Sequence, residues 1–131
     1  MPDKPPLIAI VDDDESVLRS LQRLLRACGL RAETFASGRS FLEALPRQVP
    51  ACVLLDVQMP DLDGWEVQAK LTTAGWHVPV IFITAYEDAA AQERAISAGA
   101  VALLRKPMTD QQLLEAIEVA VKRGLDESGT A

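Results

Sequence analysis

The chain has 131 residues, a mass of 14.2 kDa, a formal net charge of -6 and a pI near 4.7. Its length suits one domain that needs no disulfide or structural metal, and 49% hydrophobic with 24% charged residues excludes a disordered chain. The acidic balance argues against direct nucleic acid binding, and no apolar segment or secretory signal indicates a membrane, so a cytoplasmic protein is expected.

Apolar strand patterns alternate with helical patterns along the whole chain. The expected strands are Leu7–Val11, Arg31–Phe35, Cys52–Asp56, Val80–Ile83 and Val101–Leu104. The expected helices are Glu15–Cys28, Ser37–Pro46, Trp65–Thr73, Asp88–Ala98 and a last helix that begins with the capping box Thr109–Gln112. Five strand–helix units in this order predict a doubly wound α/β fold, in which helices cover both faces of a parallel sheet.

The chain end and the two cysteines complete this first interpretation. Residues 1–124 form the predicted domain, and Leu125–Ala131 is expected to be a polar tail or the beginning of a truncated linker. Cys28 and Cys52 both stand among apolar residues. They are therefore predicted to be reduced thiols in the core, and not a disulfide or a catalytic cysteine.

Polar side chains follow four of the predicted strands. Asp12 and Asp13 come directly after the first strand, Asp56 ends the third, Thr84 follows the fourth and Lys106 follows the fifth. In open α/β sheets the carboxyl ends of the strands border the ligand crevice. If the first and third strands are neighbours, three carboxylates meet, and protons or a cation must relieve their repulsion.

Several motifs in a fixed order identify a family. They are Val11–Asp13, Asp56, Met59–Asp61 with Gly64, Ile83–Ala85, Gly99–Ala100 and Lys106–Pro107. Over about Leu7 to Arg123 the chain resembles the receiver domain of bacterial two-component response regulators, and most closely the branch that often carries a LuxR-type helix-turn-helix effector. The resemblance implies a flavodoxin-like sheet of five parallel strands in the order 2-1-3-4-5, and a role as a phosphorylation-dependent switch in signal transduction.

The resemblance also implies a magnesium site. Asp13, Asp56 and the backbone carbonyl of Gln58 would each give the metal one oxygen, and Asp12 would act through a metal-bound water. Magnesium suits this role because it prefers oxygen ligands and keeps waters that a phosphoryl oxygen can replace.

The reaction implied is the transfer of a phosphoryl group to Asp56 from a phosphohistidine of a histidine kinase or a phosphotransfer protein. Lys106 and Thr84 would contact the phosphoryl oxygens. The Lys106–Pro107 bond is expected to be cis, as in related receivers. Tyr86, together with Gln58, would border the path of an attacking water and slow the loss of the phosphate. The protein would catalyse only its own phosphorylation and dephosphorylation.

Two residues depart from the family pattern. Leu103 stands where receivers usually have an aromatic ring that reorients on activation, and Met108 replaces a frequent phenylalanine. Switching is therefore expected to travel through the Thr84 segment and the helix that follows it. Related receivers dimerise on this surface, so a phosphorylation-dependent homodimer is expected there, with the residues Ala89, Ala90, Ala91, Leu103 and Met108.

Two other functions fit parts of the sequence. Asp12-Asp13-Asp14 after a strand has the aspartate spacing of haloacid-dehalogenase-like phosphatases, with Asp12 as the nucleophile. However, no acidic pair follows Lys106, and the chain is short for that fold. The second alternative is a binding module that is never phosphorylated, which the complete set of site residues disfavours.

Overall fold

The computed structural model describes residues 5–85 and 89–129, within which five strands alternate with five helices. The strands are β1 (Leu7–Val11), β2 (Arg31–Phe35), β3 (Cys52–Asp56), β4 (Val80–Thr84) and β5 (Ala102–Arg105). The helices are α1 (Glu15–Ala27), α2 (Gly38–Ala44), α3 (Gly64–Ala74), α4 (Ala89–Ser97) and α5 (Asp110–Gly129). The strands pair in parallel in the order β2-β1-β3-β4-β5, which confirms the predicted fold.

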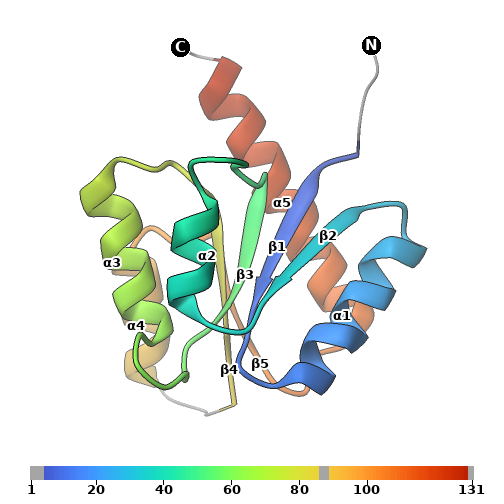
Figure 1. The fold of residues 1–131 in the computed structure, drawn as a ribbon, viewed down its shortest axis with the longest axis horizontal. Coiled ribbons are helices and arrows are strands. Elements are labelled where there is room, and N and C mark those ends of the chain that lie inside the picture. The colour runs from blue at the N-terminus through green and yellow to red at the C-terminus, as the bar shows by residue number, and fades with distance from the viewer. Residues whose placement is uncertain (1–4, 86–88, 130–131) are drawn as a thin grey trace.

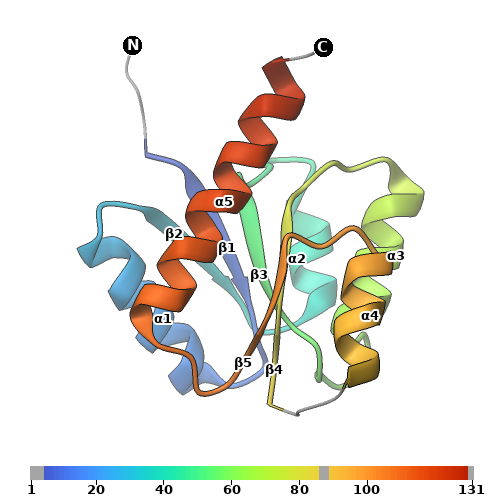
Figure 2. The same ribbon diagram turned by 180° about the vertical axis from the view of Figure 1, so that it is seen from behind.

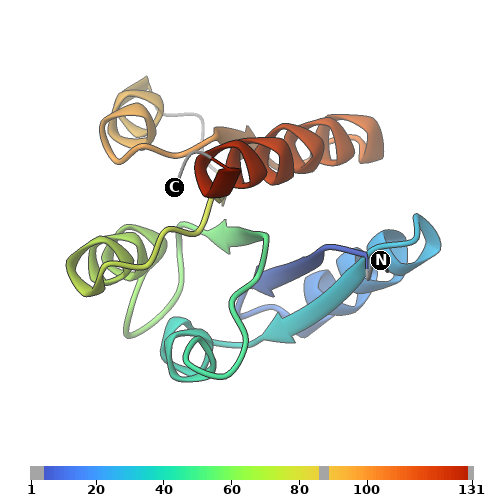
Figure 3. The same ribbon diagram turned by 90° about the horizontal axis from the view of Figure 1, so that it is seen from above.

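Helices cover both faces of the sheet, as Figure 1 and Figure 2 show from opposite sides. α1 and α5 pack on one face, while α2, α3 and α4 pack on the other, and the view from above separates the two helical layers (Figure 3). Every residue of β1, β3 and β4 is buried. Burial on both faces explains why these strands are continuous apolar runs rather than alternating ones.

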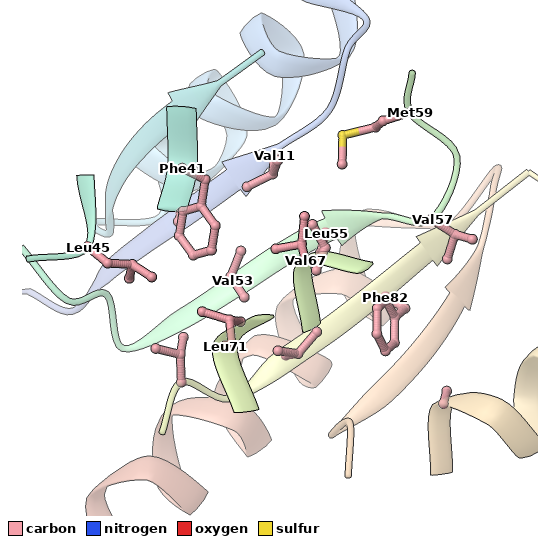
Figure 4. Packing of buried hydrophobic residues seen from close by; sticks show 14 residues of the cluster. Val11, Phe41, Leu45, Val53, Leu55, Val57, Met59, Val67, Leu71 and Phe82 are labelled. Atoms are coloured by element: carbon pink, nitrogen blue, oxygen red, sulfur yellow. The ribbon is translucent and has the colours of Figure 1, made fainter. Parts of the chain in front are cut away.

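The core beneath α2 and α3 is built from side chains of both layers (Figure 4). Phe41 from α2 and Val67 and Leu71 from α3 pack against Val53 and Leu55 of β3, and all five are at most 1% exposed. Because the interior is close-packed, this arrangement holds the ends of the central strands in fixed positions.

Local capping signals place the helix ends. The Ser37 hydroxyl accepts a hydrogen bond from the Ser40 amide at 3.1 Å at the start of α2. At the start of α5, the Gln112 amide donates to the Thr109 hydroxyl at 3.0 Å and the Thr109 amide donates to the Gln112 side chain at 2.9 Å, which confirms the predicted capping box. Gly75 ends α3 at a φ of 81°, in the left-handed region that favours glycine.

The prediction that both cysteines lie in the core is correct for Cys52 and wrong for Cys28. Cys52 is fully buried, and burial raises the pKa of its thiol to about 12, so it remains a neutral core residue. Cys28, by contrast, is exposed. The apolar stripe of α1 would carry Cys28 inward only if the helix continued, but α1 ends at Ala27 and the chain turns away at Gly29.

Several boundaries differ from the predicted ones by one or two residues, and those at the end of the chain change the interpretation most. β5 runs from Ala102 to Arg105, one residue later than the predicted Val101–Leu104. α5 continues to Gly129, so it enters the segment predicted as a tail and projects beyond the edge of the sheet where the strands begin (Figures 1 and 2). Across residues 5–85 and 89–129, none of the helices combines the length and the apolar character that crossing a membrane requires.

Candidate phosphorylation site

The candidate site lies at the edge of the sheet where the strands end, at the bottom of Figure 1. Val11 of β1 pairs with Leu55 of β3, so the next residue on each strand, Asp12 and Asp56, lies at the same level. Asp56 in turn pairs with Ile83 of β4, and Thr84 is the next residue of that strand. The sheet order therefore places the polar residues of four strands along one edge.

Three carboxylates form an acidic cluster. One oxygen of each of Asp12, Asp13 and Asp56 lies within 4.8 Å of the others. Asp12 and Asp56 are 3% and 6% exposed, whereas Asp13 is exposed to solvent. A set of oxygen ligands with one open side is the arrangement that suits a hard divalent cation that keeps part of its water shell. The residues therefore fit magnesium.

Lys106 supplies positive charge from the end of β5. Its ammonium nitrogen lies 3.2 Å from Asp12 Oδ2 and 4.0 Å from Asp56 Oδ1. The Lys106 amide donates to the Thr84 carbonyl at 2.8 Å, and the Lys106–Pro107 bond is cis, as expected. The lysine is thus fixed at its backbone while its side chain reaches between two buried acids.

Burial is the main cause of an altered pKa at Asp56. It raises the pKa of this carboxyl from 3.8 to about 6, and the negative charge of Asp12 adds to the effect. Lys106 and a hydrogen bond from the Gln58 amide act in the opposite direction. At neutral pH most Asp56 side chains are ionised and can act as nucleophiles. A pKa raised in this way is typical of a carboxyl group at a functional site.

Asp14 does not belong to the cluster. Its side chain accepts hydrogen bonds from the amide and the hydroxyl of Ser16, at 2.9 and 2.7 Å, and caps α1. These hydrogen bonds lower the pKa of Asp14. Its own amide donates to Asp12 Oδ1 at 2.9 Å, so the capping turn also orients the buried acid. Asp14 is therefore the N-cap of α1 and not a member of the acidic cluster.

Gly64 allows α3 to begin directly against the end of β3. A Cβ atom at this position would lie 2.6 Å from the carbonyl oxygen of Asp56 and 2.9 Å from Val57 Cα. Real side chains do not tolerate such contacts with backbone atoms, so glycine is required there. The Gly64 amide also donates to the Val57 carbonyl at 2.9 Å. The sequence motif contained this glycine, but its role emerges only from the packing.

A second constraint on the β3–α3 loop was not predicted. The guanidinium of Arg39 on α2 contacts Asp61 Oδ2 through two nitrogens, at 2.9 and 3.2 Å. Asp61 has a φ of 71°, which is uncommon for a residue with a side chain. No sequence spacing links these two residues, because α2 and the loop meet only in the folded chain.

The structure places the predicted site residues at different depths. Asp12, Asp13, Asp56 and Lys106 come together, as described above. Thr84 is 4% exposed and ends the neighbouring strand.

The two residues expected to border the path of water differ in what the structure shows. Gln58 is exposed, and its amide donates to Asp56 Oδ1 at a long distance of 3.4 Å. Tyr86 lies outside the described residues.

Comparison with known proteins shows the family of the chain. The family profile for the response regulator receiver domain matches residues 8–118. The chain is 41% identical over 122 residues to response regulator protein TmoT of Ectopseudomonas mendocina, an alignment that covers 93% of this chain and 56% of TmoT. The chain thus spans about half the length of the curated relatives it matches.

Solved structures show the same likeness. Response regulator StyR superposes with a TM-score of 0.88 at 39% identity, covering 96% of this chain and 64% of StyR. A response regulator receiver protein from Burkholderia phymatum has a TM-score of 0.80 at 48% identity, covering 89% and 95%. The chain belongs to the response regulator receiver domain family. It is a phosphoacceptor domain of two-component signal transduction and not an enzyme of the usual kind.

Proposed function

We propose that Asp56 is the residue that accepts the phosphoryl group. The convergence of the buried Asp12 and Asp56, the exposed Asp13 and the ammonium of Lys106 carries this proposal. Asp56 ends β3, the central strand of the sheet, and it lies next to the strand end that holds Thr84. Transfer brings the negative charge of a phosphoryl group onto the Asp56 carboxylate. Nearby cations and the Thr84 hydroxyl are needed to stabilise that charge.

In the reaction, an Asp56 oxygen attacks phosphorus as the bond from phosphorus to the donor's imidazole nitrogen breaks, and the electron pair leaves with the imidazole. Lys106 then exchanges its contact with the carboxylates for one with a phosphoryl oxygen, and the Thr84 hydroxyl donates to another. Asp13, Asp56 and the Gln58 carbonyl would hold magnesium, with Asp12 acting through water, and the bound metal would offset negative charge at the site. The chain's own contribution is positioning and electrostatics.

The phosphodonor partner is a histidine kinase or a phosphotransfer protein, which the family membership supports. Self-catalysed transfer and loss of the phosphoryl group, with magnesium, are the only reactions we assign to the chain. A cytoplasmic location and an effector domain of the LuxR type fit the same role. Their support is the acidic composition and the greater length of relatives such as TmoT.

For output, we propose a homodimer through α4 and β5 in the phosphorylated form. The surface differs from the one expected. Ala89 and Ala90 are exposed, but Ala91 is only 8% exposed, so it offers little surface to a second copy. Ile96, which is 67% exposed on α4, supplies the larger apolar contact. An isologous dimer would bury this side chain in both copies.

The test is labelling with acetyl phosphate and magnesium, followed by intact mass and hydroxylamine treatment. One phosphoryl group should appear on the parent and on Asp12→Asn, and none on Asp56→Asn. Labelling that survives Asp56→Asn but is lost in Asp12→Asn would support the phosphatase alternative, which family membership does not favour. Lack of labelling in the parent would support a binding module.

A further inference from the structure

A cavity of about 200 Å³ lies beside the candidate site, between the start of α3 and the first two turns of α4. Gln58 and Thr84 line it on the side of Asp56, and Trp65 and Arg94 line it from the two helices. Ala90 and Ala91 form the rest of the α4 wall. Because these alanines are small, the cavity stays open between Arg94 and the strand ends.

Arg94 is held at this cavity by an aromatic ring. Its guanidinium carbon lies 4.7 Å from the centroid of a Trp65 ring. That tryptophan is itself fixed, since its ring centroid is 4.4 Å from that of Phe82 in β4. Stacking of this kind orients a guanidinium without neutralising it.

The positive charge of Arg94 is also unpaired within the part of the chain that the structure describes. Among the ion pairs formed within residues 5–85 and 89–129, none involves Arg94, and its side chain is exposed. Lys106, in contrast, is already engaged with Asp12 at 3.2 Å on the other side of the site. Arg94 therefore offers an uncompensated positive charge on the Gln58 and Thr84 side.

The phosphorylation reaction needs such a charge. A divalent metal together with Lys106 balances the three carboxylates of the cluster, so a doubly negative donor arrives with nothing left to neutralise it. The chain as a whole carries a net charge of -6, which repels anions. A nearby cation raises the local concentration of an anionic donor and holds it beside the nucleophile.

We propose that Arg94 is a positioning residue for phosphoryl transfer to Asp56, and that it favours phosphodonors with a net double negative charge over those with a single one. This inference rests on the proposed function of Asp56. It goes beyond that function by naming the residue that selects donors by charge. Trp65 acts through Arg94, because the ring sets the direction of the guanidinium.

The experiment compares initial phosphorylation rates with two small donors at neutral pH, in the presence of magnesium. Acetyl phosphate is doubly negative there, whereas phosphoramidate carries a net single negative charge. The variants are Arg94→Gln and Arg94→Lys, with Arg23→Gln as the matched control. Arg23 is exposed on α1, on the other face of the sheet, and its replacement changes the net charge of the chain equally.

At donor concentrations below saturation, Arg94→Gln should lower the rate of phosphorylation by acetyl phosphate about threefold to tenfold. This is the range expected for one partly screened charge acting on a dianion. The loss should appear as a higher half-saturating concentration of donor, with the maximal rate little changed. The rate of phosphorylation by phosphoramidate should fall by less than about twofold. Arg94→Lys should recover most of the acetyl phosphate rate, and Arg23→Gln should match the parent with both donors.

Fluorescence adds a second measurement. In a Trp76→Phe background Trp65 is the sole tryptophan, so titration with beryllofluoride and magnesium reports binding beside its ring. Because beryllofluoride carries a single negative charge, Arg94→Gln should change its apparent affinity by less than about twofold, as with phosphoramidate, and should leave the affinity for magnesium alone unchanged.

Three outcomes would overturn the inference. Equal slowing with both donors would assign Arg94 a structural part in holding Trp65, and no slowing would remove it from the reaction. A lysine variant as slow as the glutamine variant would show that charge is not what matters. Failure of the proposed function is distinct, because it would appear as labelling of Asp56→Asn, whatever the Arg94 variants do.

Discussion

Asp56→Asn should stabilise the fold at neutral pH and leave it almost unchanged near pH 4. In the folded chain the pKa of Asp56 is raised from 3.8 to about 6, mainly by burial. Between these two values the folded state binds more protons than the unfolded state, so the free energy of unfolding falls as the pH rises. Asparagine does not ionise, so the free energy of unfolding of Asp56→Asn should not fall in this way.

The magnitude follows from the same shift. At about 1.4 kcal/mol per pKa unit, the ionised Asp56 destabilises the folded chain by about 3 kcal/mol once the pH exceeds 6. Asp56 is 6% exposed, so solvent screens little of this cost. For a domain of this size the gain in Asp56→Asn corresponds to a rise in Tm of roughly 10 °C at neutral pH.

Urea unfolding followed by circular dichroism measures this effect, at about pH 4 and about pH 8, in buffer with a chelator. Glu43→Gln is the matched control, because it also replaces an acid with its amide but lies exposed on α2. Its stability should follow the parent at both pH values. If Asp56→Asn differs from the parent equally at both, the raised pKa is not the cause. Adding magnesium should stabilise the parent and so narrow the difference.

Three further predictions follow from the site. The rate of labelling by a small phosphodonor should fall as the pH drops below about 6, because protonated Asp56 cannot attack, and added magnesium should move this fall to lower pH. Lys106→Ala should leave magnesium affinity unchanged or raise it, whereas Asp13→Ala should lower it, as measured by NMR titration; equal losses would mean that the lysine orders the acids. Gly64→Ala should cost about 2–4 kcal/mol in urea unfolding because its Cβ meets backbone, while Gly124→Ala, whose nearest contact is a proline side chain at 3.3 Å, should cost far less.

The fold could be predicted from the sequence because its signals are local. Continuous apolar runs such as Cys52–Asp56 indicate strands buried on both faces, and caps such as Thr109 mark where helices begin. The order of the strands came from the resemblance and not from the pattern. Where a local rule was extended past a helix end, as at Cys28, the prediction was wrong.

The acids of the site were foreseeable for a different reason. Parallel strands all end on the same edge, so residues that follow strands must gather there. The contacts that tune the site depend on tertiary packing instead. The pair Arg39–Asp61 joins residues 22 positions apart, and Arg94 meets Trp65 only because α3 and α4 lie on the same face. No periodicity in the sequence encodes such pairs.

The packing of α4 indicates how a change at Thr84 could reach the surface without an aromatic ring at Leu103. The end of α4 is held from two sides: the Gln68 side chain of α3 donates to the Ala98 carbonyl at 2.9 Å, and Arg123 of α5 donates to the Gly99 carbonyl at 3.4 Å.

The beginning of α4, in contrast, borders the cavity beside Thr84. A displacement that starts at Thr84 should therefore tilt the first turn of α4 about its anchored end. Such a tilt would move the exposed side chains of α4 while the core beneath keeps its packing, since packed interfaces shift as units and do not deform continuously.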